Sequence, residues 1–198
     1  MRNYFIVLKA NTTVDKIEGS HMAGKTLDDV KTIYIANAEC HFMPSGFEKY
    51  FKNLEGIQIY QSKLKAITQQ DLRPFPNLKE IYLDNNQLTQ IDSNLFEFNS
   101  KLRRIALGNN RIRTISVDVF DPLPDLTHVH FNSNVCISRD GKTLIEINSI
   151  ELEIIAKCQP DFQVSVDLER KFKNLQKEFD EEKMKNEEKL KKICEFFN

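Results

Sequence analysis

A repeat of 24 residues runs through the middle of the chain and limits what it can fold into. Apolar residues recur at this spacing in one column, with no insertion or deletion over five repeats: Val30, Leu54, Leu78, Leu102 and Leu126. Further apolar columns follow three, five and ten residues later in each repeat, as in Ile81, Leu83 and Leu88. A period of this length indicates one structural unit copied along the chain rather than a single irregular core.

The spacing within each repeat predicts a strand. Ile81 and Leu83 alternate with polar neighbours, which is the period of a strand that buries one face. One turn cannot cover its own apolar side chains, whereas a stack of turns forms a continuous core. The sequence therefore predicts a solenoid whose strands lie side by side.

The repeated pattern L-x-x-I-x-L-x-x-N-x-L, seen in full at 78–88, resembles the leucine-rich repeat, and the period matches its extracellular type. Phe96 and Phe120 match the phenylalanine spine of that family, with Leu72 in the earlier turn. The asparagine column reads Ala38, Ser62, Asn86, Asn110 and Asn134, so its first two members depart from the family. The resemblance implies an α/β solenoid: a right-handed horseshoe with a parallel concave sheet, an irregular convex side and a C-terminal helical tail.

Composition and pattern divide the chain into four parts. Residues 1–29 are predicted to be an N-terminal cap, with weak alternation over 4–19 indicating strands. Residues 30–136 form the array, and 137–160 form a C-terminal cap with a covering helix over 145–155. Residues 161–198 form a charged helical tail.

The cysteines are constrained by the repeat. Cys40 and Cys136 lie four repeats apart in one column, about 19 Å at the spacing of neighbouring strands, which is beyond the reach of a disulfide. Cys136 and Cys158 both belong to the predicted C-terminal cap, and we expect them to form the intrachain disulfide. The alternative is two buried thiols that act as small apolar side chains.

Several segments are similar to small secreted leucine-rich-repeat proteins of dipteran insects: 25–31, 40–46, 51–57, 71–76 and 134–137. This resemblance implies an extracellular protein, in which the sequon at Asn11 would accept a glycan. No signal peptide is visible, because the apolar run at 5–8 is too short. Related proteins pair a cysteine near the start of the array with one in the N-terminal cap. Since this sequence has no cysteine before Cys40, we expect its N-terminus to be incomplete.

The tail carries a short apolar seam at coiled-coil spacing. Leu168, Phe172, Leu175 and Phe179 follow each other at intervals of four, three and four residues. The seam favours either a single solvated helix or a homo- or heterodimer, and Cys194 near its end would suit an intermolecular disulfide. The order of array, cysteine cap and coiled coil also resembles that of dipteran leucine-rich immune proteins that work as disulfide-linked complexes.

Charge and motifs exclude several classes of function. The formal net charge of −1 lacks the basic excess typical of nucleic-acid binding, and no apolar run is long enough to span a membrane. The sequence has no zinc cysteine spacing, phosphate-binding glycine loop or hydrolase motif, so we predict neither an enzyme nor a cofactor. His128 and His130 share a strand face, but a third metal ligand is missing, and we predict no metal site.

Binding is the function that the predicted concave face favours. Its outward positions are Tyr34, Gln58, Tyr60, Glu80, Tyr82, Asp84, Arg104, His128 and His130. Tyrosine and arginine are enriched among residues that dominate binding energy. We therefore predict recognition of a protein or glycan partner on this face; the alternative is a structural adaptor that oligomerises through the tail.

Overall fold

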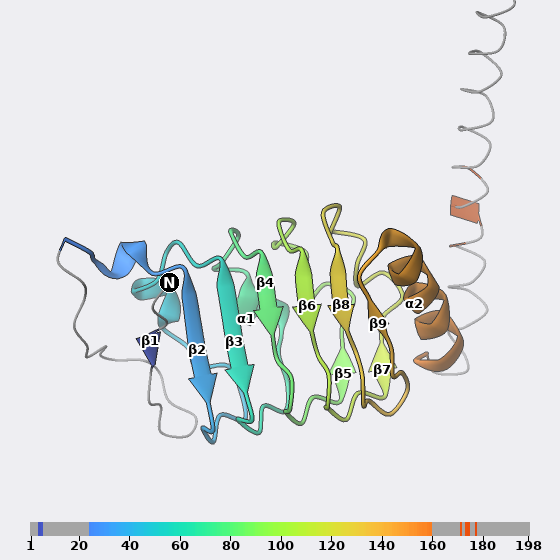
Figure 1. Cartoon of the computed structure of the whole chain (residues 1–198), viewed down its shortest axis with the longest axis horizontal. Coiled ribbons are helices and arrows are strands. Elements are labelled where there is room, and N and C mark those ends of the chain that lie inside the picture. Colours follow the sequence, from blue (N-terminus) through green and yellow to red (C-terminus); the bar gives the residue numbers. More distant parts are fainter. Residues whose placement is uncertain (1–3, 6–23, 160–170, 172, 175–176, 178–198) are drawn as a thin grey trace, which may run out of the picture. The chain divides into compact units, whose positions relative to one another are not determined.

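Stacked coils of the chain build one continuous sheet in the computed structural model, which describes residues 4–5, 24–159, 171, 173–174 and 177 (Figure 1). The chain divides into two units, Met1–Gln159 and Pro160–Asn198. The solenoid belongs to the first unit. In the second, the described residues 171, 173–174 and 177 are helical.

The main sheet has seven strands in the order β1-β2-β3-β4-β6-β8-β9. The strands are β1 (Tyr4–Phe5), β2 (Thr32–Ala36), β3 (Gly56–Tyr60), β4 (Glu80–Tyr82), β6 (Arg104–Ala106), β8 (His128–His130) and β9 (Asp140–Gly141). Neighbouring strands from β1 to β8 pair in parallel, and β2 to β8 keep the 24-residue register, so that Ile57 pairs with Ile33 and Ile81. The solenoid predicted from the period is therefore confirmed.

The last strand departs from the expected parallel arrangement. β9 pairs antiparallel with β8, joining Val129 to Gly141 and His130 to Asp140. The chain reverses within nine residues, too short a connection for the crossover that a parallel pair requires. This reversal brings Asp140, which lies outside the repeat, to the edge of the sheet.

Short elements occupy the rest of each coil. They are the 3₁₀ helices η1 (Leu27–Asp29) and η2 (Phe47–Lys49), the helix α1 (Gln69–Leu72) and the strands β5 (Gln90–Ile91) and β7 (Thr114–Ile115). β5 and β7 form a second, two-stranded parallel sheet. Outside the main sheet the coils thus consist of irregular chain and a few short elements, in line with the predicted irregular convex side.

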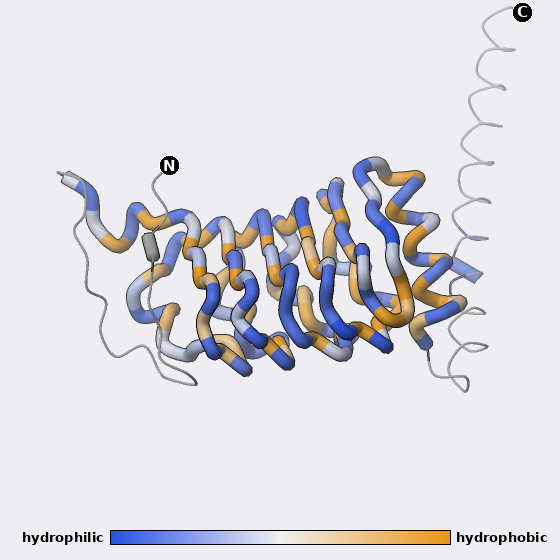
Figure 2. Tube along the Cα trace, turned by 60° about the horizontal axis from the view of Figure 1, so that its bottom comes forward, coloured by the Kyte–Doolittle hydropathy of each residue, from blue (hydrophilic) through white to orange (hydrophobic). Residues whose placement is uncertain are grey.

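The core follows the apolar columns from turn to turn. Apolar positions recur at the same place in successive coils (Figure 2), and Ile57, Ile81 and Leu83 are fully buried. Phe96 and Phe120 of the predicted spine and Leu72 are buried as well. Phe47, Phe51 and Phe75 add aromatic bulk at positions that the column pattern did not single out.

The asparagine column ties the coils together through buried amides. The Asn110 amide nitrogen donates to the carbonyls of Leu83 and Leu107, each at 3.0 Å, and its oxygen accepts from the backbone of Leu88 at 3.0 Å. The side chain therefore satisfies buried backbone groups of two turns. Where the column departs from asparagine, Ser62 accepts from the Ala38 backbone at 3.3 Å and donates to the Tyr60 carbonyl at 2.9 Å.

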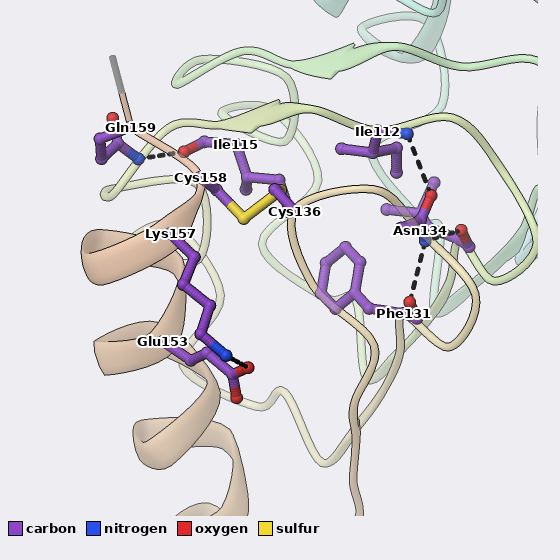
Figure 3. The surroundings of a disulfide bond; sticks show 10 residues. Ile112, Ile115, Phe131, Asn134, Cys136, Glu153, Lys157, Cys158 and Gln159 are labelled. Atoms are coloured by element: carbon purple, nitrogen blue, oxygen red, sulfur yellow. Dashed lines mark hydrogen bonds and ion pairs between the residues drawn. A yellow bond between two sulfur atoms is a disulfide. The ribbon is translucent and has the colours of Figure 1, made fainter. Parts of the chain in front are cut away.

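The helix α2 (Leu144–Lys157) covers the end of the array beside β9 (Figure 1). It buries Ile147, Ile150, Ile154 and Ile155, and Thr143 caps its N-terminus by accepting from the Glu146 backbone. A disulfide joins Cys136 to Cys158 at the end of the helix, with Cα atoms 5.2 Å apart (Figure 3). Cys40 is a buried free thiol.

Some sequence predictions concern residues outside the described part of the chain. Tyr4 and Phe5 form β1, but the rest of the predicted N-terminal strands, with Asn11, lies beyond the described residues. The seam residues of the tail and Cys194 also lie there.

Candidate functional site on the concave face

The outward positions of β2, β3, β4, β6 and β8, here called the concave face, align into rows across the sheet. One row is Tyr34, Gln58, Tyr82, Ala106 and His130. A second is Thr32, Gly56, Glu80, Arg104 and His128, and a third contains Ala36 and Tyr60, with Asp84 one period further on. The structure thus brings all nine sequence-predicted residues to one face, because strand alternation turns every second side chain away from the core.

Glu80 links two of these residues. Its carboxylate accepts from the Tyr82 hydroxyl at 3.1 Å and from an Arg104 guanidinium nitrogen at 3.1 Å. Burial raises the pKa of the Tyr82 phenol, and the hydrogen bond to Glu80 and the charge of Glu80 raise this pKa further. Because exposed ion pairs contribute roughly 0–1 kcal/mol, these contacts matter mainly for holding the tyrosine and arginine side chains in place.

His130 reaches across the neighbouring turn to two carboxylates. Its Nδ1 lies 2.7 Å from Asp84 Oδ1, and its Nε2 lies 3.6 Å from Asp140 Oδ1. Asp84 follows β4, two strands away from β8, so His130 must pass over the turn that follows β6. The imidazole is thereby fixed between two acidic side chains.

Gly108 makes this reach feasible. A Cβ at position 108 would lie 2.3 Å from His130 Cε1 and 2.7 Å from its Nδ1, closer than side-chain atoms approach one another. The Gly108 backbone nitrogen also donates to Asp84 Oδ1 at 2.9 Å. The sequence predicted Asp84 and His130 as separate surface residues; it missed Gly108 and Asp140. The signal for Gly108 was a glycine two residues after a strand.

A hollow of about 210 Å³ lies on the concave face at its C-terminal end. Its lining includes Tyr82, Arg104, Ala106, His128, His130 and Lys142. Ala106 lies between Tyr82 and His130 in its row. It has only a methyl side chain, whereas its two neighbours have aromatic rings. The small side chain therefore accounts for the depression. Ala106 and Lys142 are not among the binding residues predicted from the sequence.

The described part of the chain carries several histidine and carboxylate side chains. No group of three or more His, Cys, Asp or Glu side chains is arranged there to hold a metal ion. His128 Nδ1 lies 3.0 Å from the hydroxyl of its neighbour Thr127. Among the same residues, no helix has the length and apolar character to cross a bilayer.

Comparison with known proteins agrees with this geometry. The family model "Leucine rich repeat" matches residues 76–135, the part of the array that carries the complete pattern. The array is built of leucine-rich repeats.

A solved structure of low sequence identity shares the fold of this leucine-rich-repeat array. A chain in the structure of the Drosophila Toll–Spatzle complex in its glycosylated form is 22% identical, with a TM-score of 0.50 over 54% of the present chain and 14% of that one. A chain in the TLR13–ssRNA13 complex is 16% identical, with a TM-score of 0.47 over 56% and 16% of the two chains. The present chain thus spans about one seventh of these much longer proteins. No curated protein matches it in sequence.

Proposed function

We propose that this protein is a non-enzymatic recognition module that binds a protein partner through its concave face. The observation that carries the proposal is the concentration of tyrosine, arginine and histidine side chains on one face of a sheet whose other face is sealed in the core. Tyr34, Tyr60, Tyr82 and Arg104 are of the types that dominate binding energy at protein interfaces. Tyrosine provides a large contact area at small entropic cost because only two side-chain torsions must be fixed.

The rigidity and size of the face support the same proposal. Five strands at about 4.8 Å spacing span roughly 24 Å, enough for a standard interface of about 800 Å² on each partner. Glu80 holds Tyr82 and Arg104, and Asp84 holds His130, so these side chains are already ordered before binding. Side chains ordered in advance lose less entropy on association.

An extracellular location belongs to the proposal. The Cys136–Cys158 disulfide is of the kind that persists in oxidising compartments, and the repeat is of the extracellular length. The Toll–Spatzle complex is described as a hub in Drosophila development and innate immunity. We extend the proposal to innate immune recognition on the basis of the order of array, cysteine cap and tail.

Partner capture with concave-face variants tests the proposal. Tyr60→Ala combined with Tyr82→Ala should abolish capture of the partner from native extracellular fluid, since two large contact side chains are removed. The free energy of unfolding should fall by no more than about 1 kcal/mol, because both residues are partly exposed.

Phe98→Ala is the matched control, since it removes an exposed aromatic ring that lies between β5 and β6 and away from the concave strands. It should leave capture unchanged. Normal capture by the double tyrosine variant, with loss in Phe98→Ala, would contradict binding through the concave face.

A further inference from the structure

The hollow between Tyr82 and His130 has the size of one side chain. Pockets for drug-sized ligands and cofactors are usually about 300–1,000 Å³, and this one is about 210 Å³. It is nevertheless about seven times the volume that one water molecule occupies in the liquid. The hollow therefore suits a single inserted group rather than a cofactor or a helix.

The walls of the hollow are fixed and its floor is apolar. The floor is the Ala106 side chain, which is 7% exposed. The Tyr82 ring is held through its hydroxyl by Glu80, and the His130 ring is held by Asp84. An apolar group that enters between the two rings would displace water without forcing either wall to move.

The charged side chains at the rim differ in whether they already have a partner. Asp140, which also lines the hollow, already faces His130 and accepts from the Asn132 amide at 2.6 Å. Glu80 accepts hydrogen bonds from Tyr82 and Arg104, two residues that line the hollow. Lys142 is exposed and forms no salt bridge within the described residues, although its charge also acts on the neighbouring Glu146 carboxylate. The rim therefore offers one exposed cation that is in no salt bridge among the described residues, whereas Asp140 and Glu80 already have partners.

We propose that the hollow anchors one apolar side chain of leucine to phenylalanine size from an acidic segment of the partner, with a neighbouring carboxylate of that segment contacting Lys142. The proposal rests on recognition through the concave face and adds the chemistry that is recognised. An apolar anchor in a preformed pocket supplies affinity, and the carboxylate beside it selects against basic segments.

Peptide titration of the ¹⁵N-labelled full chain tests the anchor. The probes are the acetylated, amidated tripeptides Asp-Phe-Glu, Asp-Ala-Glu and Lys-Phe-Lys, followed through the amide signals of Gly108 and Gly141. Asp-Phe-Glu should bind about tenfold more tightly than Asp-Ala-Glu, since the ring is buried only in the former. It should also bind more tightly than Lys-Phe-Lys. Equal affinities for the three peptides, or no shift at either glycine, would overturn the proposal.

Variants locate the binding in the hollow. Ala106→Leu fills it and should weaken Asp-Phe-Glu about tenfold or more, whereas Ala36→Leu makes the same change at the other end of the concave face and should leave affinity unchanged. Lys142→Glu keeps the backbone N–H that Glu146 accepts from and should weaken Asp-Phe-Glu about fivefold. Equal affinities in the two leucine variants, or no effect of Lys142→Glu, would reject the hollow as the anchor site. That result would leave concave-face recognition standing if the double tyrosine variant still loses its partner.

Discussion

A left-handed residue follows each strand of the array at the point where the chain turns inward. The five residues have φ between 49° and 60°: Asn37, Gln61, Asn85, Asn109 and Ser133. Each stands one position before the asparagine column. The left-handed conformation costs roughly 1–2 kcal/mol for an ordinary residue, and asparagine tolerates it best after glycine. Three of the five positions carry asparagine, and Gln61 is the least suited occupant.

We predict that Gln61→Asn stabilises the protein by about 0.5 kcal/mol, since the shorter amide relieves the strain of the left-handed backbone. Urea denaturation followed by circular dichroism measures the difference. Gln87→Asn is the control, because Gln87 is not among the described residues with positive φ, and it should bring no gain. A loss of stability in Gln61→Asn would argue against backbone strain at this position.

Asn110 contributes to stability through the hydrogen bonds of its side chain rather than through its backbone conformation. We predict that Asn110→Ala lowers the free energy of unfolding by about 2–4 kcal/mol, since the carbonyls of Leu83 and Leu107 and the N–H of Leu88 lose a buried partner. The same denaturation measurement applies. Asn94→Ala removes an exposed amide and should change stability by less than about 0.5 kcal/mol. Similar effects of the two substitutions would mean that the column is not essential.

At the scale of elements, α2 and β9 close the end of the array that the repeat leaves open. The capping box at the start of α2 connects them. The Glu146 carboxylate accepts from the backbone nitrogens of Lys142 and Thr143, at 2.8 and 3.1 Å, while Thr143 accepts from the Glu146 backbone. These bonds hold the chain between β9 and the helix, next to the rim of the hollow.

The Lys142 backbone N–H, followed by the Thr143 side chain, lowers the pKa of Glu146 below its usual value. The ionised carboxylate therefore stabilises the folded state at neutral pH. This contribution is lost as the pH falls through the folded-state pKa. We predict that Glu146→Gln has a lower melting temperature than the wild type at neutral pH, and that the difference shrinks in acid. Melting curves across this range test it, and a difference that grows in acid would contradict the assignment.

Elements that follow the 24-residue repeat could be predicted from the sequence. Elements outside the repeat, apart from the covering helix, could not. The strands, the buried columns and the covering helix are each set by local apolar spacing, which the sequence displays directly. The contacts of His130 with Asp84 and Asp140 depend on the small residues Ala106 and Gly108. Small residues give no periodic signal in the sequence. Asp140 reaches His130 only because β9 runs antiparallel, outside the repeat.

At the scale of the whole molecule, recognition and adaptor functions predict different assemblies. A recognition module is expected to be monomeric both as the full chain and as residues 1–160. An adaptor is expected to be a dimer that is lost when 161–198 are removed. Light scattering of the two proteins at matched concentrations separates these outcomes, and a dimer confined to the full chain would favour the adaptor.

Photo-crosslinking from the concave face tests the central claim most directly. p-Benzoylphenylalanine is placed at Tyr60 in one variant and at Phe98 in another, and each is irradiated in native extracellular fluid. Tyr60 lies on the concave face, whereas Phe98 lies outside the concave strands and is partly exposed. Recognition through the concave face predicts a covalent partner adduct from position 60 and none from position 98. An adduct from position 98 alone would contradict it.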